Sequence, residues 1–562
     1  MKKKLPERFI DGRTVADGTR FEADVCLVGA GPVGLAMAEA LVARGLTVCI
    51  VESGGFKYDP AEHELCRGEK AGDATVDPYA IRTRQFGGLS NVWSIIFDRT
   101  RIGVRYVPLD PIDMEARDEV PHSGWPFAFS ELVPFYEQAH AVCELGAFDY
   151  DGASRATPAA GCVVSPDGEL RTSLFQFGPA DRFFGRSPAI LARSGRARVL
   201  LHTSALEIDV SDDSAHVTGL RVGCLDGRRM SVVARSYVLS IGALENARLM
   251  LLSNRRNSAG VGNRHGLVGR YLMDHPQDYS SYIAPKNRDL FDRLAMYDLQ
   301  ADKGVGYMAK LGFTEHAIRK NGLLNMSFLM IPLEATTMTP AVNSFRALLT
   351  GHSRFKPPVG LFAKMQAMAR DPISIAHHLY RFYATPGVIS SIGYGGWSRV
   401  VDKARTFVDH IEVVNQIEQY PHADNRVTLG DSVDAFGQRR LRYDFSWRHE
   451  DQERFVHSRR HFARLVEESG LGTYHFDPQA RPSEPTSHHP MGTTRMHVDP
   501  TQGVVDENCQ VHGMDNLFVA GSSLFPTGGY ANPTLSAIAM GLRLATFLAA
   551  VVPLLDLNRQ SR

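Results

Sequence analysis

The C-terminal part of the chain holds the residues whose types best suit proton transfer. His488 and His489 begin the motif His-His-Pro-Met-Gly-Thr-Thr-Arg-Met, and Asn532 lies in a second motif over residues 528–535. An imidazole titrates near neutral pH, so His489 is a candidate to remove a hydroxyl proton while hydride leaves the adjacent carbon. One histidine among 21 is more often structural, so the assignment depends on its surroundings. The sequence contains no Ser-His-Asp order, HExxH motif or P-loop that competes for this role.

The second motif also predicts the start of a helix. Asn532 is a good N-cap, Pro533 suits the first helical position, and the largely apolar residues 535–548 form the body. A helix N-terminus attracts anions because its first N–H groups have no partner within the helix. Gly528 and Gly529 would let a flat ring lie against the backbone.

Near the N-terminus, a strand, a glycine-rich turn, a helix and a second strand follow one another. A short apolar run over 24–28, bounded by the acid Asp24, precedes the turn. Residues 35–44 have the composition of a helix, and the apolar run 47–51 ends at Glu52. The turn has the G-x-G-x-x-G spacing, which in this context predicts a dinucleotide site with the pyrophosphate at the helix N-terminus.

Each glycine of that motif has its own expected role. Gly29 permits the tight turn, Gly31 lets the backbone approach the pyrophosphate, and Gly34 lets helix and strand pack closely. Glu52 would accept hydrogen bonds from the adenosine ribose, which disfavours NADP because its 2′-phosphate would face a carboxylate. The choice between NAD and FAD stays open at this point, although distant partner strands suit a large bound flavin better.

Two later apolar runs, 237–241 and 516–520, resemble further strands of the same sheet. The predicted fold class is α/β, or α+β overall, with a discontinuous Rossmann-like domain formed by residues 1–110, 190–285 and 485–562. Residues 405–420 alternate apolar and polar for part of their length, as in a half-buried antiparallel strand. We therefore assign a substrate-binding domain, built on an antiparallel sheet with helices, to residues 111–189 and 286–484.

A helical insertion is predicted near residues 340–384. Its apolar residues are interleaved with basic ones, which leaves a lid, an oligomer contact or a membrane-surface helix open. Two packed helices of the second domain are the favoured interpretation.

Composition excludes several classes of protein. The 62 Lys and Arg balance the 62 Asp and Glu, so the chain lacks the basic excess of a nucleic-acid binder. Seven scattered cysteines predict neither a disulfide framework nor a metal site. The N-terminus has no apolar signal-peptide core, and the apolar run 544–555 is too short to span a bilayer. We expect a cytoplasmic protein without a membrane span.

Six motifs in order resemble the glucose-methanol-choline (GMC) flavin oxidoreductases over most of the chain. They are VGAGPVG with Glu52, FGGLSNVW (86–93), YVLSIGALENARLML (237–251), GRYLMDHP (269–276), HHPMGTTRM (488–496) and NLFVAGSSLFPTGGYANPTL (516–535). The resemblance implies an FAD domain beside a substrate domain. It also implies that His489 is the base while hydride passes to flavin N5, and that Asn532 orients the substrate oxygen.

The same resemblance implies which residues contact the cofactor. Val92 occupies the position at which some relatives carry a flavin-linked histidine, so a non-covalent FAD is expected, and Ser94 replaces a common glycine. The expected cofactor-binding residues are Gly29, Gly31, Pro32, Val33, Gly34, Glu52, Ser53, Gly87, Gly88, Ser90, Asn91, Val92, Ala205, Gly242, Ala243, Gly521, Ser522, Asn532, Pro533 and Thr534.

The motif details are similar to those of bacterial sugar and glycoside dehydrogenases and pyranose oxidases. This similarity implies oxidation of a secondary alcohol of a sugar, glycoside or polyol to a ketone, with dioxygen, a quinone or a redox protein as electron acceptor. The alternatives are a non-redox lyase on the same FAD scaffold, oxidation of a non-sugar alcohol, and a flavoprotein that only binds. A homo-oligomer is left open.

Overall fold

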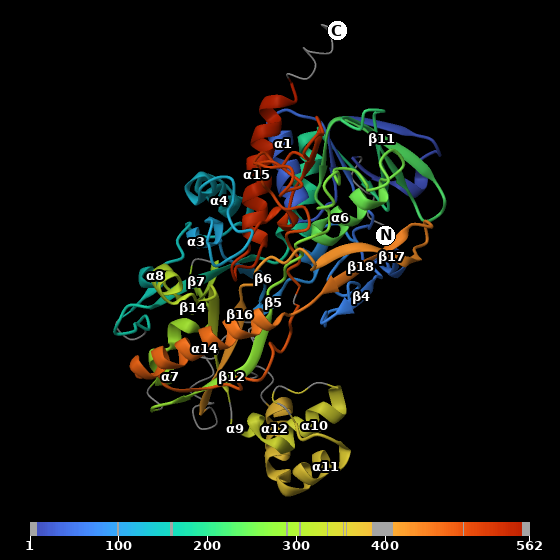
Figure 1. The fold of residues 1–562 in the computed structure, drawn as a ribbon. Helices are drawn as coiled ribbons and strands as arrows, with labels where there is room; N and C mark the ends of the chain where they lie inside the picture. The colour runs from blue at the N-terminus through green and yellow to red at the C-terminus, as the bar shows by residue number, and fades with distance from the viewer. Residues whose placement is uncertain are drawn as a thin grey trace.

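Two large β-sheets with helices packed on them make up most of the molecule (Figure 1). The structure is a computed structural model, which describes residues 8–97, 100–157, 161–287, 290–302, 305–333, 335–351, 353, 355, 357–384, 409–486 and 488–553.

The first sheet has a parallel centre. Its strand order is β1-β8-β3-β2-β11-β10-β9, with β20 also paired to β11. The pairs from β1 to β11 and the β11–β20 pair are parallel, whereas β10 pairs antiparallel with β11 and β9. The strands are β1 (Phe9–Asp11), β2 (Arg20–Val28), β3 (Val48–Val51), β8 (Ala197–Leu201), β9 (Ser204–Val210), β10 (Val217–Gly223), β11 (Arg229–Leu239) and β20 (Leu517–Val519).

This sheet brings together the four apolar runs expected to share it. β2 and β3 begin the chain's parallel unit, β11 contains most of the run 237–241, and β20 lies within 516–520. All four residues of β3 are buried, as expected for a parallel strand covered on both faces. The prediction of a discontinuous parallel sheet is confirmed.

Helices pack on this sheet and on one another. α1 and α15 lie side by side, and α15 also packs against α4 (Figure 1). α15 is long and apolar enough to cross a membrane, but most of it is buried in the protein, which is typical of a core helix. These helices are α1 (Pro32–Ala43), α4 (Phe129–Cys143), α5 (Ser187–Ser194), α6 (Gly242–Leu252) and α15 (Thr534–Val551).

The second sheet is antiparallel throughout. Its order is β19-β12-β16-β15-β14-β7-β6-β5, and β13 also pairs with β14. The predicted strand within 405–420 is β16; residues 405–408 lie outside the described part. The strands are β5 (Ile95–Phe97), β6 (Thr100–Tyr106), β7 (Leu170–Pro179), β12 (Gln277–Pro285), β13 (Gln300–Asp302), β14 (Val305–Phe313), β15 (Met326–Leu333), β16 (His410–Ile417) and β19 (Gly472–His475).

Some strands of this sheet come from segments assigned to the other domain. β5 and β6 lie within 1–110 and β12 lies within 190–285, yet all three pair in the antiparallel sheet. A third, small sheet joins β4 (Glu69–Gly72) to β17 (Arg426–Val433) and β18 (Arg439–Phe445). The two domains therefore exchange more chain than the predicted boundaries allow, because strand pairing between distant segments decides where each belongs.

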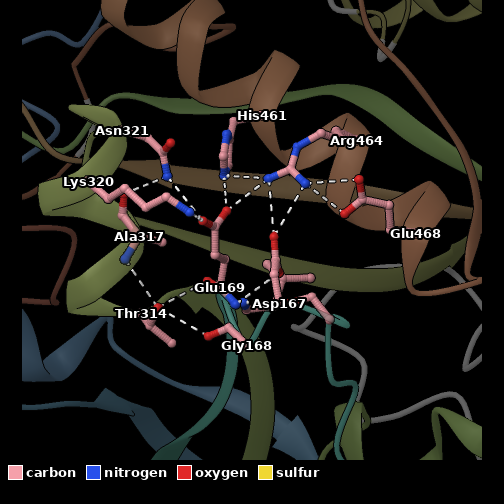
Figure 2. Close-up of polar contacts among 12 residues, drawn as sticks. Asp167, Gly168, Glu169, Thr314, Ala317, Lys320, Asn321, His461, Arg464 and Glu468 are labelled. Atoms are coloured by element: carbon pink, nitrogen blue, oxygen red, sulfur yellow. Dashed lines mark hydrogen bonds and ion pairs between the residues drawn. The ribbon is translucent and has the colours of Figure 1, made fainter.

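A buried carboxylate joins the second sheet to its helices (Figure 2). Glu169, at the start of β7, is 1% exposed. It accepts hydrogen bonds from Lys320 (2.9 Å) at the end of α8 (Glu315–Asn321) and from His461 (2.7 Å) and Arg464 (2.9 Å) of α14 (His449–Glu468). These partners compensate the cost of burying its charge.

The insertion near 340–384 forms three helices, α10 (Pro340–Thr350), α11 (Leu361–Arg370) and α12 (Pro372–Ala384). They pack on one another and on α9 (Ala335–Met338), and form a lobe at the end of the molecule away from α1 and α15 (Figure 1). No residue of α11 is buried. The remaining short helices are α2 (Pro60–Glu64), α3 (Pro111–Met114) and α7 (Leu290–Arg293).

Candidate active site

A cavity of about 1030 Å³ is lined by residues from both large sheets. The N-termini of α1, α6 and α15 open into it, and their N-cap residues are Gly31, Ile241 and Pro533. None of these three residues makes a side-chain capping hydrogen bond. The cavity therefore meets three helix ends whose dipoles favour negative charge.

The three motif glycines have different surroundings. Gly29 has φ +103° and donates its N–H to the Val51 carbonyl at 2.8 Å. A Cβ at position 34 would lie 2.2 Å from the Gly29 carbonyl oxygen, whereas a Cβ at position 31 would meet no atom within 4 Å. Gly34 is thus required by helix–strand packing, and the open space beside Gly31 belongs to the cavity.

Glu52 holds the glycine-rich turn in place. Its carboxylate oxygens accept hydrogen bonds from the backbone N–H groups of Ala30 (2.9 Å) and Gly54 (2.8 Å). Burial raises the pKa of Glu52 despite these bonds. Glu52 also lines the cavity, and each oxygen keeps a second lone pair with which it can accept a ribose hydroxyl.

Most of the expected cofactor-binding residues line the cavity, but Gly34, Gly87 and Ser90 do not. Gly87 has φ +93°, and a Cβ there would lie 2.6 Å from the Phe184 Cβ. The Ser90 hydroxyl donates to the Gly87 carbonyl at 2.7 Å within the 3-10 turn η2 (Gly88–Asn91). Gly34, Gly87 and Ser90 therefore support residues that line the cavity without lining it themselves.

Gly528 and Gly529, which precede Asn532, pack closely against other protein atoms. A Cβ at position 528 would lie 2.2 Å from Met491 Sδ, and one at position 529 would lie 2.2 Å from Asp113 Oδ2. Neither residue lines the cavity. Close packing against Met491 and Asp113 is therefore the observed reason for glycine at these two positions, and contact with a flat ring stays a prediction.

The start of α15 also differs from the prediction. Pro533 is the N-cap and Thr534 the first helical residue, so Asn532 does not cap the helix. Its side chain is instead committed to His489, because Asn532 Nδ2 lies 3.0 Å from His489 Nε2. Both residues line the cavity, and the structure thus brings the two expected catalytic residues into contact.

A second histidine contacts the other side of the His489 ring. His275 Nδ1 lies 3.2 Å from His489 Nδ1, and His275 Nε2 lies 3.4 Å from the Gly528 carbonyl. A carbonyl can only accept, so His275 Nε2 carries the hydrogen and Nδ1 is an acceptor. His489 then donates from Nδ1, and its unprotonated Nε2 accepts the hydrogen bond from Asn532 Nδ2.

The electrostatics keep both imidazoles neutral. Burial lowers the pKa of His275 to about 4. Burial, and then the neighbouring His275, Arg105 and His488, lower the pKa of His489 well below 6.5. At neutral pH His489 is therefore an unprotonated base with its Nε2 directed at Asn532.

The chain pairing that aligns the two histidines was not visible in the sequence. Met273 and Met491 form an antiparallel bridge, and the Asp274 carboxylate accepts the backbone N–H groups of His275 (2.7 Å) and His489 (3.1 Å). His275 lies within the GRYLMDHP motif, which was the available signal. Other lining residues that carried no such signal are Arg105 and Gln277.

Comparison with known proteins agrees with this geometry. The family model described as GMC oxidoreductase matches residues 421–541. An oxygen-dependent choline dehydrogenase from Rhizobium etli is 31% identical over 612 residues, covering 96% of this chain and 98% of that protein. The chain belongs to the GMC oxidoreductase family. This GMC oxidoreductase is also 24% identical to a 6'''-hydroxyparomomycin C oxidase from Streptomyces lividus, over 94% of this chain and 91% of that protein.

The fold of this GMC oxidoreductase is shared with solved structures. A formate oxidase crystal structure superposes with a TM-score of 0.53 at 17% identity, covering 95% of this chain and 99% of that one. Both the parallel Rossmann-like sheet and the antiparallel substrate-domain sheet are thus confirmed. The protein is an FAD oxidoreductase, an oxidase or dehydrogenase, that acts on alcohol-type substrates and passes electrons to an acceptor.

The residues present fit FAD, the cofactor typical of this family. The uncapped N-termini of α1 and α15, the free space at Gly31 and the acceptors of Glu52 provide the contacts that a pyrophosphate, a reduced flavin ring and a ribose need. Ala205 of β9 and Gly521 also line the cavity, at the positions expected to contact the cofactor.

Proposed function

We propose that this enzyme oxidises a secondary hydroxyl of a sugar, glycoside or related polyol to a ketone. The observation that carries the proposal is the contact of His489 Nε2 with Asn532 Nδ2, 3.0 Å apart at the cavity wall. An alcohol oxygen that replaces the direct contact between the two groups would meet a proton acceptor and a hydrogen-bond donor. That is the pair needed to activate a hydroxyl group.

Each group of the chain has a distinct part in the reaction. His489 Nε2 removes the hydroxyl proton, and Asn532 Nδ2 donates a hydrogen bond that orients the alcohol oxygen. His275 Nδ1 accepts from His489 Nδ1 and so keeps the proton-accepting nitrogen at Nε2. Bound FAD supplies the hydride acceptor at its N5 atom, and the N-terminus of α15 favours the negative charge of the reduced ring.

The substrate class is supported by motif detail and by relatives. The HPMGTTRM and NPTL segments are similar to those of sugar and glycoside oxidoreductases, and a fructose dehydrogenase large subunit from Gluconobacter japonicus is 22% identical over 93% of this chain and 97% of that protein. We further propose that FAD is held without a covalent bond, because Val92 lines the cavity and has no nucleophilic atom.

Anaerobic mixing of the purified holoenzyme with sugars, glycosides and polyols tests the proposal. Loss of the oxidised flavin absorbance is the expected result, and admission of oxygen then distinguishes an oxidase from a dehydrogenase. If only non-sugar alcohols reduce the flavin, the proposed sugar substrate is wrong and a non-sugar alcohol is the substrate. No reduction by any alcohol, with turnover of another kind, would favour the non-redox alternative.

A further inference from the structure

One face of the antiparallel sheet carries two basic side chains and an aromatic ring. Arg105 of β6 pairs with Phe177 of β7, and Lys310 of β14 pairs with Ser173 of β7. Residues 173, 175 and 177 alternate along β7, so their side chains share a face. Between them, the Phe175 ring centroid lies 5.0 Å from Arg105 Cζ and 5.2 Å from Lys310 Nζ.

The two basic side chains, Lys310 and Arg105, differ in their hydrogen-bond partners. Lys310 is fully buried, donates to Ser173 Oγ at 2.6 Å and to the Tyr530 hydroxyl, and lies 4.1 Å above the Tyr530 ring. Arg105 lines the cavity, and its buried Nη1 has no hydrogen-bond partner in the part of the chain that the structure describes. A buried guanidinium nitrogen without a hydrogen-bond partner is costly, so this atom is suited to bind a ligand in the cavity.

The nearby carboxylates of Asp110 and Glu418 already have partners other than Arg105. Asp110 pairs with Arg171 and accepts from Asn325 at 3.0 Å, and Glu418 pairs with Arg117. Burial alone lowers the pKa of Arg105 to about 10, and no acidic residue opposes that shift. Arg105 therefore stays charged at neutral pH without a counterion in the described protein.

The position of Arg105 in the fold points to the substrate, and not the cofactor, as its ligand. Arg105 lines the same cavity as His489 and Asn532, and its charge contributes to the lowered pKa of His275 and His489. It belongs to the substrate-domain sheet, whereas the helix N-termini suited to the cofactor's charges belong to the parallel sheet. A guanidinium presents two parallel N–H groups that match a carboxylate.

We propose that Arg105 binds a carboxylate on the substrate, so that the enzyme prefers an acidic sugar or a related hydroxy acid over the neutral sugar. This inference rests on the proposed function, since it names the substrate class of the same site. The carboxylate supplies the missing counterion of Arg105, and it holds the neighbouring hydroxyl carbon near His489. A neutral sugar would leave the guanidinium unpaired in the closed site.

A matched substrate pair tests the preference. The wild-type holoenzyme is mixed anaerobically with methyl β-D-glucuronide or methyl β-D-glucoside, which differ only in the carboxylate at C6, and flavin reduction is followed. We expect the second-order rate constant to favour the glucuronide by about tenfold or more. R105Q should abolish this preference and R105K should keep part of it. Equal constants, or preference for the glucoside or its 6-phosphate, would overturn the inference.

Binding without turnover gives a second readout. Titration with benzoate, which has no oxidisable hydroxyl, should perturb the bound flavin spectrum, and its Kd should rise about tenfold or more in R105Q. R198Q is the matched control, because it removes another arginine that stacks on an aromatic ring, Phe21, but lies outside the cavity. Flavin content and melting temperature confirm that each variant is folded.

The two proposals fail in different ways. If neither sugar reduces the flavin, the proposed function fails, while the benzoate titration still tests the anion site. If both sugars reduce it and R105Q slows both equally without changing benzoate binding, the carboxylate inference is wrong. That last result would instead assign Arg105 to the charge of the reduced flavin.

Discussion

His275 Nδ1 lies 3.2 Å from His489 Nδ1, although the two residues are far apart in the sequence. His275 Nε2 faces the Gly528 carbonyl at 3.4 Å, which fixes the hydrogen of the His275 ring on that nitrogen. The pair therefore resembles a base and its orienting partner, with one neutral histidine setting the tautomer of the other. In many active sites a carboxylate has this role; here the neutral partner avoids raising the pKa of the base.

Replacing His275 should slow the reaction without removing the base. In H275L the Nδ1 of His489 loses its acceptor, so the proton can occupy either nitrogen. We expect anaerobic flavin reduction to fall by about 10- to 100-fold. H275N places an amide oxygen where Nδ1 was and should recover part of the rate. Equal rates in H275L and the wild type would contradict the tautomer account.

Removal of His489 itself should be more severe. H489A loses the proton acceptor, and the rate constant for flavin reduction should fall by about 10²- to 10⁴-fold, measured by stopped-flow spectroscopy. H488A is the neighbouring control. His488 is exposed and makes no hydrogen bond to His489 or Asn532 among the described residues, so its loss should cost less than about tenfold. A larger effect for H488A than for H489A would reverse the assignment.

The pH dependence follows from the lowered pKa of His489. A base must be unprotonated to act, and a histidine whose pKa lies well below 6.5 stays unprotonated at lower pH. The rate constant for flavin reduction should therefore change by no more than about twofold between pH 8 and 6. R105Q removes a nearby positive charge, so the acid limb should move to higher pH. A wild-type inflection at pH 6.5 or above would contradict the assignment.

The buried carboxylate of Figure 2 should be a large contributor to stability. E169Q removes the shared charge partner of Lys320, His461 and Arg464, of which Lys320 and Arg464 are partly exposed, and the lost hydrogen bonds to a charged group should cost about 1–3 kcal/mol. E468Q removes a partly exposed partner of the same Arg464, 2.7 Å away, and should cost about 0.5 kcal/mol. Denaturant unfolding measures both values, and equal costs would refute the distinction.

The same cluster sets a pH limit on stability. Burial raises the pKa of Glu169, but hydrogen bonds from Lys320, His461 and Asn321 outweigh it, so the folded-state pKa is lower than 4.5. The stabilising contribution is therefore complete above the unfolded pKa and is lost as the pH falls through the folded value. E169Q should lose this part of the acid dependence.

Local patterns were sufficient for the parallel unit and for the principal catalytic pair. The glycine spacing, the buried strands and the terminal Glu52 specify neighbouring elements, so β2, α1 and β3 follow from sequence alone. His489 and Asn532 each lie in a dense motif, and the family resemblance connected them. Their direct contact and the cap at Pro533 depend on side-chain packing that the motif does not contain.

Contacts between distant segments could not be predicted in the same way. The antiparallel bridge at Met273 and Met491 aligns His275 with His489, and it depends on the pairing of two irregular segments. Arg105 lies in β6, whose partner β7 is far along the chain, so its place in the cavity has no local signature. The domain boundaries differ for the same reason, because β6 and β12 pair across them.

The central claim is that His489 activates the hydroxyl of a sugar-type alcohol beside the flavin. The most direct measurement compares anaerobic flavin reduction in the wild-type holoenzyme and in H489A, both loaded with FAD, across neutral and acidic pyranosides. The account predicts reduction in the wild type and a rate lower by about 10² or more in H489A at equal flavin content. Equal rates in the two proteins, or no reduction of the wild type by any sugar, glycoside or polyol, would contradict it.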